Sequence, residues 1–165
     1  MGFTPDPSMR PVPSSVRTAA RAVVVRDGRL LAIAMRDREG EFFILPGGGQ
    51  RHGETLAETL RRETKEEIGV GLEPGPVLYV REYIGKNHDF AREHLHFHQV
   101  EVVFRCQLPA GAEPGAGAAH DRRQVGVAWL ELAKLGECRF FPAFLKKCVR
   151  GGDLAVDPIY WGDLN

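Results

Sequence analysis

Short apolar runs separated by turn residues predict strands in the first third of the chain. Small and β-branched residues predominate from Arg17 to Val25, and a second apolar run follows Asp27-Gly28, from Leu30 to Met35. An Asp-Gly pair between two apolar runs is typical of a hairpin, because it supplies the positive φ values that a tight turn needs. The charged stretch 36–40 predicts a loop, and the apolar run 42–45 predicts a short strand.

The next segment has the capping residues and the period of a helix. Thr55 and Glu58 form a capping box, which places the start of a helix at Leu56, and Gly69 is a residue type that commonly ends one. At about 100° per residue, the less polar side chains of this segment fall on one stripe. They are Leu56, Leu60, Thr64 and Ile68. We therefore predict one amphipathic helix that packs on the strands.

After this helix the pattern predicts further strands, at 77–84, 94–108 and 125–130. Two loops separate them: a polar one at 85–92, and a Gly/Ala/Pro-rich one at 109–119 that we expect to be mobile. Residues 141–150 predict a second helix, and 158–163 form a short aromatic tail. Strands before and after a central helix, followed by another helix, favour an α/β fold with a mixed β-sheet and helices on both faces.

Composition and charge narrow the class of protein. A length of 165 residues fits one domain, and an apolar fraction of 43% with a charged fraction of 27% is ordinary for a globular protein. The 22 basic residues are balanced by 22 acidic ones, so the net charge favours neither nucleic-acid nor membrane binding. Any polyanionic ligand would have to be met locally.

The N-terminal residues differ from the rest of the chain. Positions 1–16 are rich in proline and serine, which predicts a flexible arm ahead of a single domain over 17–165. The chain has no apolar run that predicts a signal peptide or a membrane span, and its three cysteines lack paired spacing. We expect a cytoplasmic protein with reduced thiols.

Three glutamates on the predicted helix carry the clearest chemical signal. Glu63, Glu66 and Glu67 are spaced i, i+3 and i+4, so a helix places their carboxylates on one side. At about 5 to 6 Å and an effective dielectric near 20, each like-charge pair costs roughly 3 kcal/mol, so a cation is expected between them. Mg²⁺ or Mn²⁺ suits this position, because hard divalent ions bind oxygen ligands. The alternative is a solvated acidic helix that follows a glycine turn.

These glutamates belong to a longer pattern of glycine and polar residues at set spacing. Its members are Gly48, Glu54, Arg62, Glu63, Glu66, Glu67, Gly69 and Val70. The pattern resembles the signature of the Nudix hydrolases, a family that cleaves nucleoside diphosphates linked to another moiety. Thr64 departs from it, since the family usually has an aliphatic residue there. The resemblance extends over the chain from Arg17 onward and implies an α/β/α sandwich with a mixed β-sheet.

The resemblance also implies a metal-dependent pyrophosphohydrolase, which cleaves a phosphoanhydride by the attack of water. It assigns Mg²⁺ or Mn²⁺ to Glu63, Glu66 and Glu67, with a backbone carbonyl of Gly47 or Gly48 as a further ligand. Glycine at those positions lets the main chain approach the ion or the phosphates closely.

Two hypotheses are open for the role of Arg62. Its planar guanidinium suits a bidentate ion pair, so we expect it to orient Glu54 or Glu63 for catalysis. The other hypothesis is that Arg62 is exposed and forms an ion pair with Glu58, four residues earlier on the helix.

The general base and the substrate contacts stay open. Glu63 competes for the proton with Glu101, Glu113 and Asp121, and Gln124 stands near the position where many relatives carry an acid. Five residues are candidates for contacting the substrate, although the arginines among them could equally be surface charges. They are Arg36, Arg51, Arg81, Glu101 and Asp121.

His94, His96 and His98 would share one face of the strand predicted at 94–108. Neighbours on such a face lie about 6.5 to 7 Å apart, too far to close a tetrahedral zinc site without other elements. A polar rim beside the substrate cleft, or a half-solvated sheet face, is favoured over a zinc site.

These hypotheses are compatible with three classes of protein. The leading one is a hydrolase of a nucleotide-derived small molecule, such as ADP-ribose or a nucleoside triphosphate. A non-catalytic nucleotide sensor on the same fold and a zinc protein are the rivals. The aromatic residues at 159–161 would pack either on the body of the chain or on a second subunit, which makes a homodimer possible.

Overall fold

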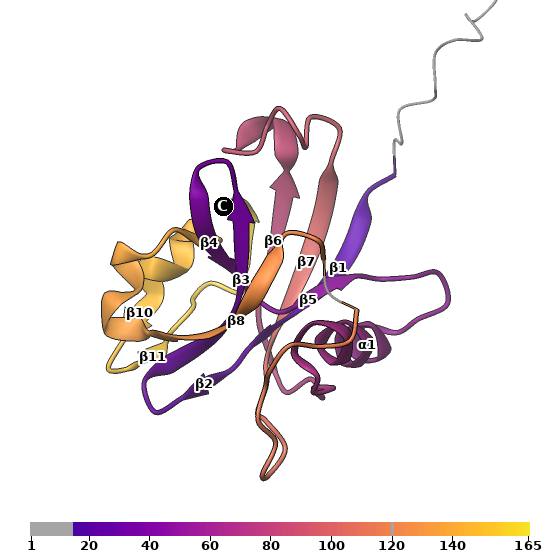
Figure 1. Ribbon diagram of the computed structural model, residues 1–165. Helices are drawn as coiled ribbons and strands as arrows, with labels where there is room; N and C mark the ends of the chain where they lie inside the picture. The colour runs from indigo at the N-terminus through magenta and orange to yellow at the C-terminus, as the bar shows by residue number, and fades with distance from the viewer. Residues whose placement is uncertain (1–14, 120) are drawn as a thin grey trace, which may run out of the picture.

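The structure is a computed structural model that describes residues 15–119 and 121–165 (Figure 1). Most of the predicted N-terminal arm, residues 1–14, lies outside the described residues. The elements in chain order are β1 (Arg17–Val23), β2 (Val25–Arg26), β3 (Arg29–Asp37), β4 (Gly40–Ile44), β5 (Gly47–Gly49), α1 (Leu56–Ile68), β6 (Val77–Ile84), the 3-10 helix η1 (Gly85–Asn87), β7 (His98–Arg105), β8 (Gln124–Glu131), the 3-10 helices η2 (Leu132–Glu137) and η3 (Ala143–Cys148) on either side of β9 (Phe140–Phe141), β10 (Val149–Arg150), β11 (Asp153–Leu154) and β12 (Tyr160–Asp163).

The strands form two five-stranded sheets, where the sequence predicted one. The first has the order β12-β6-β7-β1-β5, and it is mixed because β1 pairs with β7, and β12 with β6, in parallel. The second has the order β2-β3-β4-β9, with β8 on β3. The chain crosses from the first sheet to the second between β1 and β2, so the apolar run 17–25 serves both.

Successive side chains along the strands point to opposite faces of the sheets and belong to two separate hydrophobic clusters. Leu30 belongs to one buried cluster and Leu31 to the other, and Val103 and Phe104 divide in the same way. Because side chains alternate across a strand, both faces of these sheets are covered. One cluster includes residues of α1, and the other includes residues of η2 and η3. The protein is thus a mixed α/β fold with mixed sheets, as predicted.

Helix α1 follows its sequence signals closely. Thr55 is the N-cap, its side chain and that of Glu58 form the capping box, and Gly69 ends the helix at φ 74°. Thr59, Leu60, Thr64 and Ile68 are buried, so the predicted stripe is correct except that Leu56 is only partly buried. The Thr64 hydroxyl donates to the carbonyl of Leu60 and accepts from the N–H of Leu72, which explains how a polar residue fits an apolar stripe.

The α-helix predicted at 141–150 is wrong. The segment forms the 3-10 helix η3, which has only six residues. Phe141, which precedes Pro142, pairs with Ile44 as part of β9, and Val149 and Arg150 pair with β11 as a strand. The residues left between them are too few for a stable α-helix.

The strand predicted at 94–108 begins four residues later, at His98. Residues 94–97 form turns, because the N–H of Phe97 bonds to the carbonyl of His94 and its carbonyl accepts from Gly85. His94 and His96 therefore do not share a strand face with His98. The loop predicted at 36–40 is also shorter, since β3 continues to Asp37.

The loop 109–119, expected to be mobile, is attached to the end of α1. The N–H groups of Gly115, Gly117 and Ala119 donate to the carbonyls of Ile68, Glu67 and Glu66. These carbonyls lie in the last turn of the helix, where they lack partners within it. A Cβ at Gly117 would lie 2.0 Å from the Glu66 carbonyl oxygen, so only glycine fits this approach.

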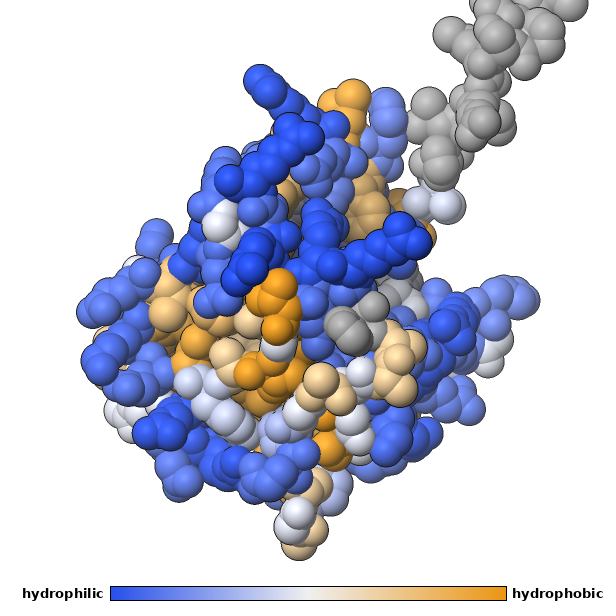
Figure 2. All heavy atoms as spheres, in the orientation of Figure 1, coloured by the Kyte–Doolittle hydropathy of each residue, from blue (hydrophilic) through white to orange (hydrophobic). Residues whose placement is uncertain are grey.

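On the face drawn in Figure 2, hydrophilic residues cover most of the surface and apolar residues gather near its middle. No helix among residues 15–119 and 121–165 is long and apolar enough to cross a membrane.

Candidate active site

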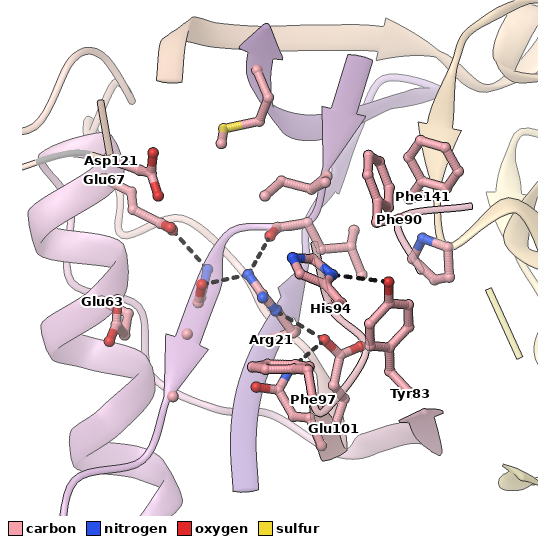
Figure 3. A pocket seen from close by; sticks show the side chains of 18 of the residues that line it. Arg21, Glu63, Glu67, Tyr83, Phe90, His94, Phe97, Glu101, Asp121 and Phe141 are labelled. Carbon is pink, nitrogen blue, oxygen red and sulfur yellow. Dashed lines mark hydrogen bonds and ion pairs between the residues drawn. The ribbon is translucent and has the colours of Figure 1, made fainter. Parts of the chain in front are cut away.

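A cavity of about 480 Å³ opens between α1, the two sheets and the loop that joins β6 to β7 (Figure 3). Its lining has three chemically different sides. Glycines and carboxylates line one side, a buried group of arginine, glutamine and glutamate side chains lines another, and aromatic rings line the third.

Arg62 holds the acidic side of the site together. Its guanidinium makes a bidentate pair with Glu54, at 2.7 and 2.8 Å, and donates to Glu63 at 2.6 Å. A further N–H bonds to the carbonyl of Gly49 at 3.1 Å. The Arg62 guanidinium lowers the pKa of Glu54 to about 2. Arg62 therefore contacts both of its predicted partners, and the reading as a mere surface partner of Glu58 is wrong.

Glu67 points from α1 toward strand β5. Its carboxylate accepts from the N–H of Gly47 at 2.7 Å, and it lines the cavity together with Glu63. Burial raises the pKa of Glu67 to about 7, with Glu63 and Glu66 adding to the effect. Glu66 lies 3.8 Å from Arg51 and from Arg62.

Arginine relieves only part of the repulsion predicted among the three glutamates: Arg62 contacts Glu63 and lies 3.8 Å from Glu66, whereas both of these glutamates still raise the pKa of Glu67. Within the described residues, no three His, Cys, Asp or Glu side chains already lie in a group that could hold a metal ion. The donor set nevertheless fits a hard divalent cation: three carboxylates lie within about one helical turn, and two of them, Glu63 and Glu67, line the cavity. Glu63, Glu66 and Glu67 would turn toward such an ion from their present partners.

The two glycines proposed as carbonyl ligands differ in what they face. In the antiparallel pairing of β1 with β5, Ala20 lies opposite Gly48. The pairs two residues to either side are hydrogen-bonded: Ala22 donates to Pro46, and Gln50 donates to Thr18. Hydrogen-bonded pairs recur at every second residue of an antiparallel ladder, so Ala20 and Gly48 form one too, and the Gly48 carbonyl points toward β1. The carbonyl of Gly47 points the other way, where Arg21 donates to it. The geometry thus favours Gly47 over Gly48 as a ligand.

Gly48 is needed for a different reason. A Cβ placed on it would lie 2.4 Å from the carboxyl carbon of Glu63. The lack of a side chain at Gly48 lets the Glu63 carboxylate lie directly against β5.

The second side of the cavity is built on Glu101, which is buried in the middle of the first sheet. Arg81 donates to it at 2.6 Å, Gln99 at 2.9 Å and Arg21 at 3.4 Å. Burial opposes its ionisation, but Arg81 and Arg21 outweigh that effect, and the pKa of Glu101 lies below its usual value. Arg81 also donates to the carbonyl of Leu164.

Arg21 was not predicted as a site residue. It joins this buried group to β5, because it donates to the carbonyls of Leu45 and Gly47. The signal that could have identified it is a single arginine within a run of small apolar residues, 19–25. A charge in a buried strand is rarely found without a partner.

The third side is aromatic. Phe90 contacts Phe42 and Phe141, with ring centroids 5.7 and 5.1 Å apart, and His94 lies 5.8 Å from Phe90. The Nδ1 of His94 lies 3.0 Å from the hydroxyl of Tyr83. Burial lowers the pKa of His94, which favours its neutral form. His94 thus belongs to this wall of rings, and no metal group in the described part of the chain includes it.

The remaining predicted residues fall inside and outside the cavity. Arg81, Glu101 and Asp121 line it, whereas Arg36 and Arg51 are exposed and do not. Glu113, a candidate base, pairs with Arg26 at the surface.

Gln124 is buried and lines the cavity as well. Its amide nitrogen donates to the carbonyl of Glu67 at 2.9 Å, and its Oε1 has no hydrogen-bond partner. That oxygen can accept from a water or from a hydroxyl or N–H of a ligand.

A NUDIX domain profile matches residues 16–150, and the chain therefore belongs to the NUDIX family. The solved MutT NUDIX hydrolase from Burkholderia pseudomallei is 30% identical, with a TM-score of 0.57 over 72% of this chain and 85% of that one. A NUDIX hydrolase structure from Nitrosomonas europaea, 16% identical, shares the fold at a TM-score of 0.62 over 90% of this chain and 80% of that one.

Curated relatives match shorter segments. The nucleoside triphosphatase NudI of an Enterobacter species is 40% identical over 60 residues, which are 34% of this chain and 43% of the relative. The putative ADP-ribose pyrophosphatase YjhB of Bacillus subtilis is 29% identical over 101 residues, 61% of this chain and 46% of the relative. The chain thus spans less than half the length of these relatives.

Proposed function

We propose that this protein is a divalent-metal-dependent pyrophosphohydrolase, which cleaves the phosphoanhydride of a nucleoside diphosphate linked to another moiety. The observation that carries the proposal is the position of two carboxylates at one side of a cavity large enough for a small ligand: Glu67 binds the N–H of Gly47, and the Arg62-bound Glu63 lies against Gly48. A second side of the cavity carries aromatic rings on which a base can stack.

The acidic side would hold Mg²⁺ or Mn²⁺ through Glu63, Glu66, Glu67 and the carbonyl of Gly47. A divalent ion bound there would neutralise phosphate charge and lower the pKa of a bound water. Arg62 would keep Glu63 in place through its pair with Glu54, and a rigid second contact of this kind preserves the geometry of the reacting groups.

In the reaction, water adds to one phosphorus, the bridging P–O bond breaks, and the leaving phosphate takes the electron pair. The water's proton passes to a carboxylate. We propose Glu63 as that base, because Glu101 is committed to two arginines and Glu113 lies outside the cavity. Asp121, at the rim, is the competitor.

The substrate class is supported by relatives of two kinds, one named as a nucleoside triphosphatase and one as a putative ADP-ribose pyrophosphatase. Either substrate has the phosphoanhydride and the base that the two sides of the cavity suit. Arg81 and Glu101 are hydrogen-bonded to each other, and their other polar atoms bind Arg21, Gln99 and the carbonyl of Leu164. We therefore propose that they fix the shape of the cavity and do not bind the substrate directly.

The test is a panel of ADP-ribose, nucleoside triphosphates, dinucleoside polyphosphates and nucleotide sugars, incubated with the purified protein and Mg²⁺ or Mn²⁺. We expect hydrolysis of at least one, and none with EDTA. Glu66→Gln and Glu67→Gln should each lower kcat by about a hundredfold or more, and Asp121→Asn should not. Activity that survives chelation contradicts the metal mechanism, and nucleotide binding without turnover indicates a sensor.

A further inference from the structure

The aromatic side of the cavity depends on one loop, residues 85–97, which joins β6 to β7. This β6–β7 loop carries Phe90, His94 and Phe97 into the cavity. It is closed at its base by the hydrogen bond from the N–H of Gly85 to the carbonyl of Phe97, at 2.8 Å. A Cβ at Gly85 would lie 2.0 Å from the carbonyl oxygen of His94, so the loop folds tightly over its own start.

Asp163, on strand β12, binds the last residue of β6 and two residues at the beginning of this loop. Its carboxylate accepts from the N–H of Ile84 at 2.9 Å, from the amide of Asn87 at 2.6 Å, and pairs with Nε2 of His88 at 2.5 Å. The Asp163 side chain is 21% exposed and that of His88 is 13% exposed, so this contact is largely shielded from water. A half-buried carboxylate with three donors is a specific anchor.

A series of contacts leads from this anchor to the cavity. His88 stacks on Tyr83, with ring centroids 5.0 Å apart and an angle of 19° between the planes. The hydroxyl of Tyr83 lies 3.0 Å from Nδ1 of His94, and His94 packs against Phe90 and Phe97 at the cavity. Each step is a direct contact.

Strand β12 is itself held by the body of the protein. It pairs in parallel with β6, and Trp161 stacks on Phe144 with ring centroids 4.8 Å apart. Asp163 therefore connects the β6–β7 loop to a strand that is itself fixed.

We infer that Asp163 is a positioning residue for the substrate, which holds the β6–β7 loop so that its rings form the aromatic side of the cavity. This inference rests on the proposed function. Asp163 holds the aromatic side of the cavity, on which a base would stack, and does not contact the carboxylates of α1. Its loss therefore weakens binding of the substrate, which raises KM, and leaves the rate of the chemical step unchanged.

The experiment compares Asp163→Ala with Asp153→Ala in the full chain. Asp153 is the control, because its carboxylate also accepts from a side chain, that of Arg105, and from a backbone N–H, that of Leu154, but it contacts neither the β6–β7 loop nor the cavity. Hydrogen exchange of residues 85–97 is measured first, without substrate. Steady-state kinetics follow, with whichever nucleotide of the panel the wild type hydrolyses.

We expect exchange of the loop to accelerate about tenfold or more in Asp163→Ala, and not in Asp153→Ala. KM should rise about tenfold with kcat within about twofold. His88→Phe keeps the stacking on Tyr83 but loses the pair with Asp163, so it should show a smaller change in the same direction. It also provides the test if Asp163→Ala does not fold.

Loop exchange that is the same in the Asp163 and Asp153 variants would overturn the inference, whatever the activity. A fall in kcat with KM unchanged would overturn it too, because a positioning residue of the binding wall does not act on the chemical step alone. If the wild type hydrolyses no nucleotide, the proposed function fails, and the exchange comparison still decides whether Asp163 positions the loop.

Discussion

At the residue scale, arginine side chains determine how the charges of this protein are held. A cation was expected among the carboxylates of α1, and the guanidinium of Arg62 takes part of that role, because it contacts Glu63 and lies 3.8 Å from Glu66. Arg21 and Arg81 do the same for the buried Glu101. Planar guanidinium groups suit such sites because they bond to several oxygens at once.

The pair Gly47 and Gly48 provides the first prediction. Gly48→Ala would place a Cβ against the flexible end of the Glu63 side chain, which can rotate away, so the fold should survive while kcat/KM falls at least about tenfold. Gly47→Ala would meet the backbone carbonyl of Ala20 at 2.2 Å, at a φ of 124°, and should cost about 2 kcal/mol or more of stability. Thermal unfolding and kinetics of the two variants would measure the difference. Equal losses of stability would contradict this account.

Glu101 provides a prediction about pH. Its folded pKa is lowered, so the stability it contributes is present above its unfolded pKa, near 4.5, and is lost as the pH falls through the folded value. Glu101→Gln leaves Arg21 and Arg81 without their buried anion and should lower the free energy of unfolding by about 3 kcal/mol at pH 7. Urea unfolding of both proteins should show this gap unchanged from pH 8 to 6 and narrowing below about pH 4. A gap that stays constant down to pH 3 would show that the Glu101 charge is not its source.

At the element scale, local signals and distant contacts determined different elements. The limits of α1 agree with the prediction because its cap, stripe and stop are all encoded by residues close in sequence. The segment 141–150 does not form an α-helix because the pairing of β9 with β4 and of β10 with β11 leaves too few residues between them. The loop 109–119 is held by helix carbonyls that lie more than forty positions away in sequence.

Strand β12 provides the prediction at this scale. The aromatic tail was expected to pack on the body or on a second subunit, and it pairs with β6 of the same chain. A chain that ends after Asp157 loses this pairing, the contact of Trp161 with Phe144 and the Asp163 anchor. Burial of one aromatic side chain stabilises by about 2 kcal/mol, so the melting temperature should fall by roughly 4 to 8 °C. An unchanged melting temperature would mean that the tail adds no stability, and the mass in solution would report any effect on assembly.

At the scale of the whole molecule, the stability of the protein should respond to divalent ions. A folded state that binds a cation more tightly than the unfolded chain is stabilised by RT ln(1 + [L]/Kd), about 2.7 kcal/mol at a hundredfold excess over Kd. Millimolar Mg²⁺ or Mn²⁺ should therefore raise the melting temperature by several degrees. In EDTA, the Glu66→Gln, Glu67→Gln double variant should melt higher than the wild type, because Glu67 is a desolvated carboxylate beside two others.

The same variant should respond little to added metal. A wild type that is indifferent to both ions, or a double variant that melts lower than the wild type in EDTA, would contradict a cation site formed by these carboxylates. A Gly136→Ala variant would serve as a control for general effects of substitution, because Gly136 is exposed, lies outside the cavity, and has nothing within 4 Å of an added Cβ.

The sequence by itself determined the parts of this protein that depend on neighbours along the chain. The capped helix α1, the Asp27-Gly28 hairpin and the run of β6 were all predictable, because helix and turn hydrogen bonds join residues a few positions apart. The grouping of glutamates on one side of α1 followed from the helical period alone.

Tertiary structure decided which of the predicted residues meet. Arg81, Glu101 and Asp121 line the cavity, whereas Arg36 and Arg51 do not, and Arg21 joins them although no local signal was used to select it. The register of β1 with β5 turned the Gly47 carbonyl toward the cavity, and the tail returned to β6 to anchor the loop 85–97. These outcomes depend on strand pairing between residues that are far apart in sequence, which side-chain periodicity does not specify.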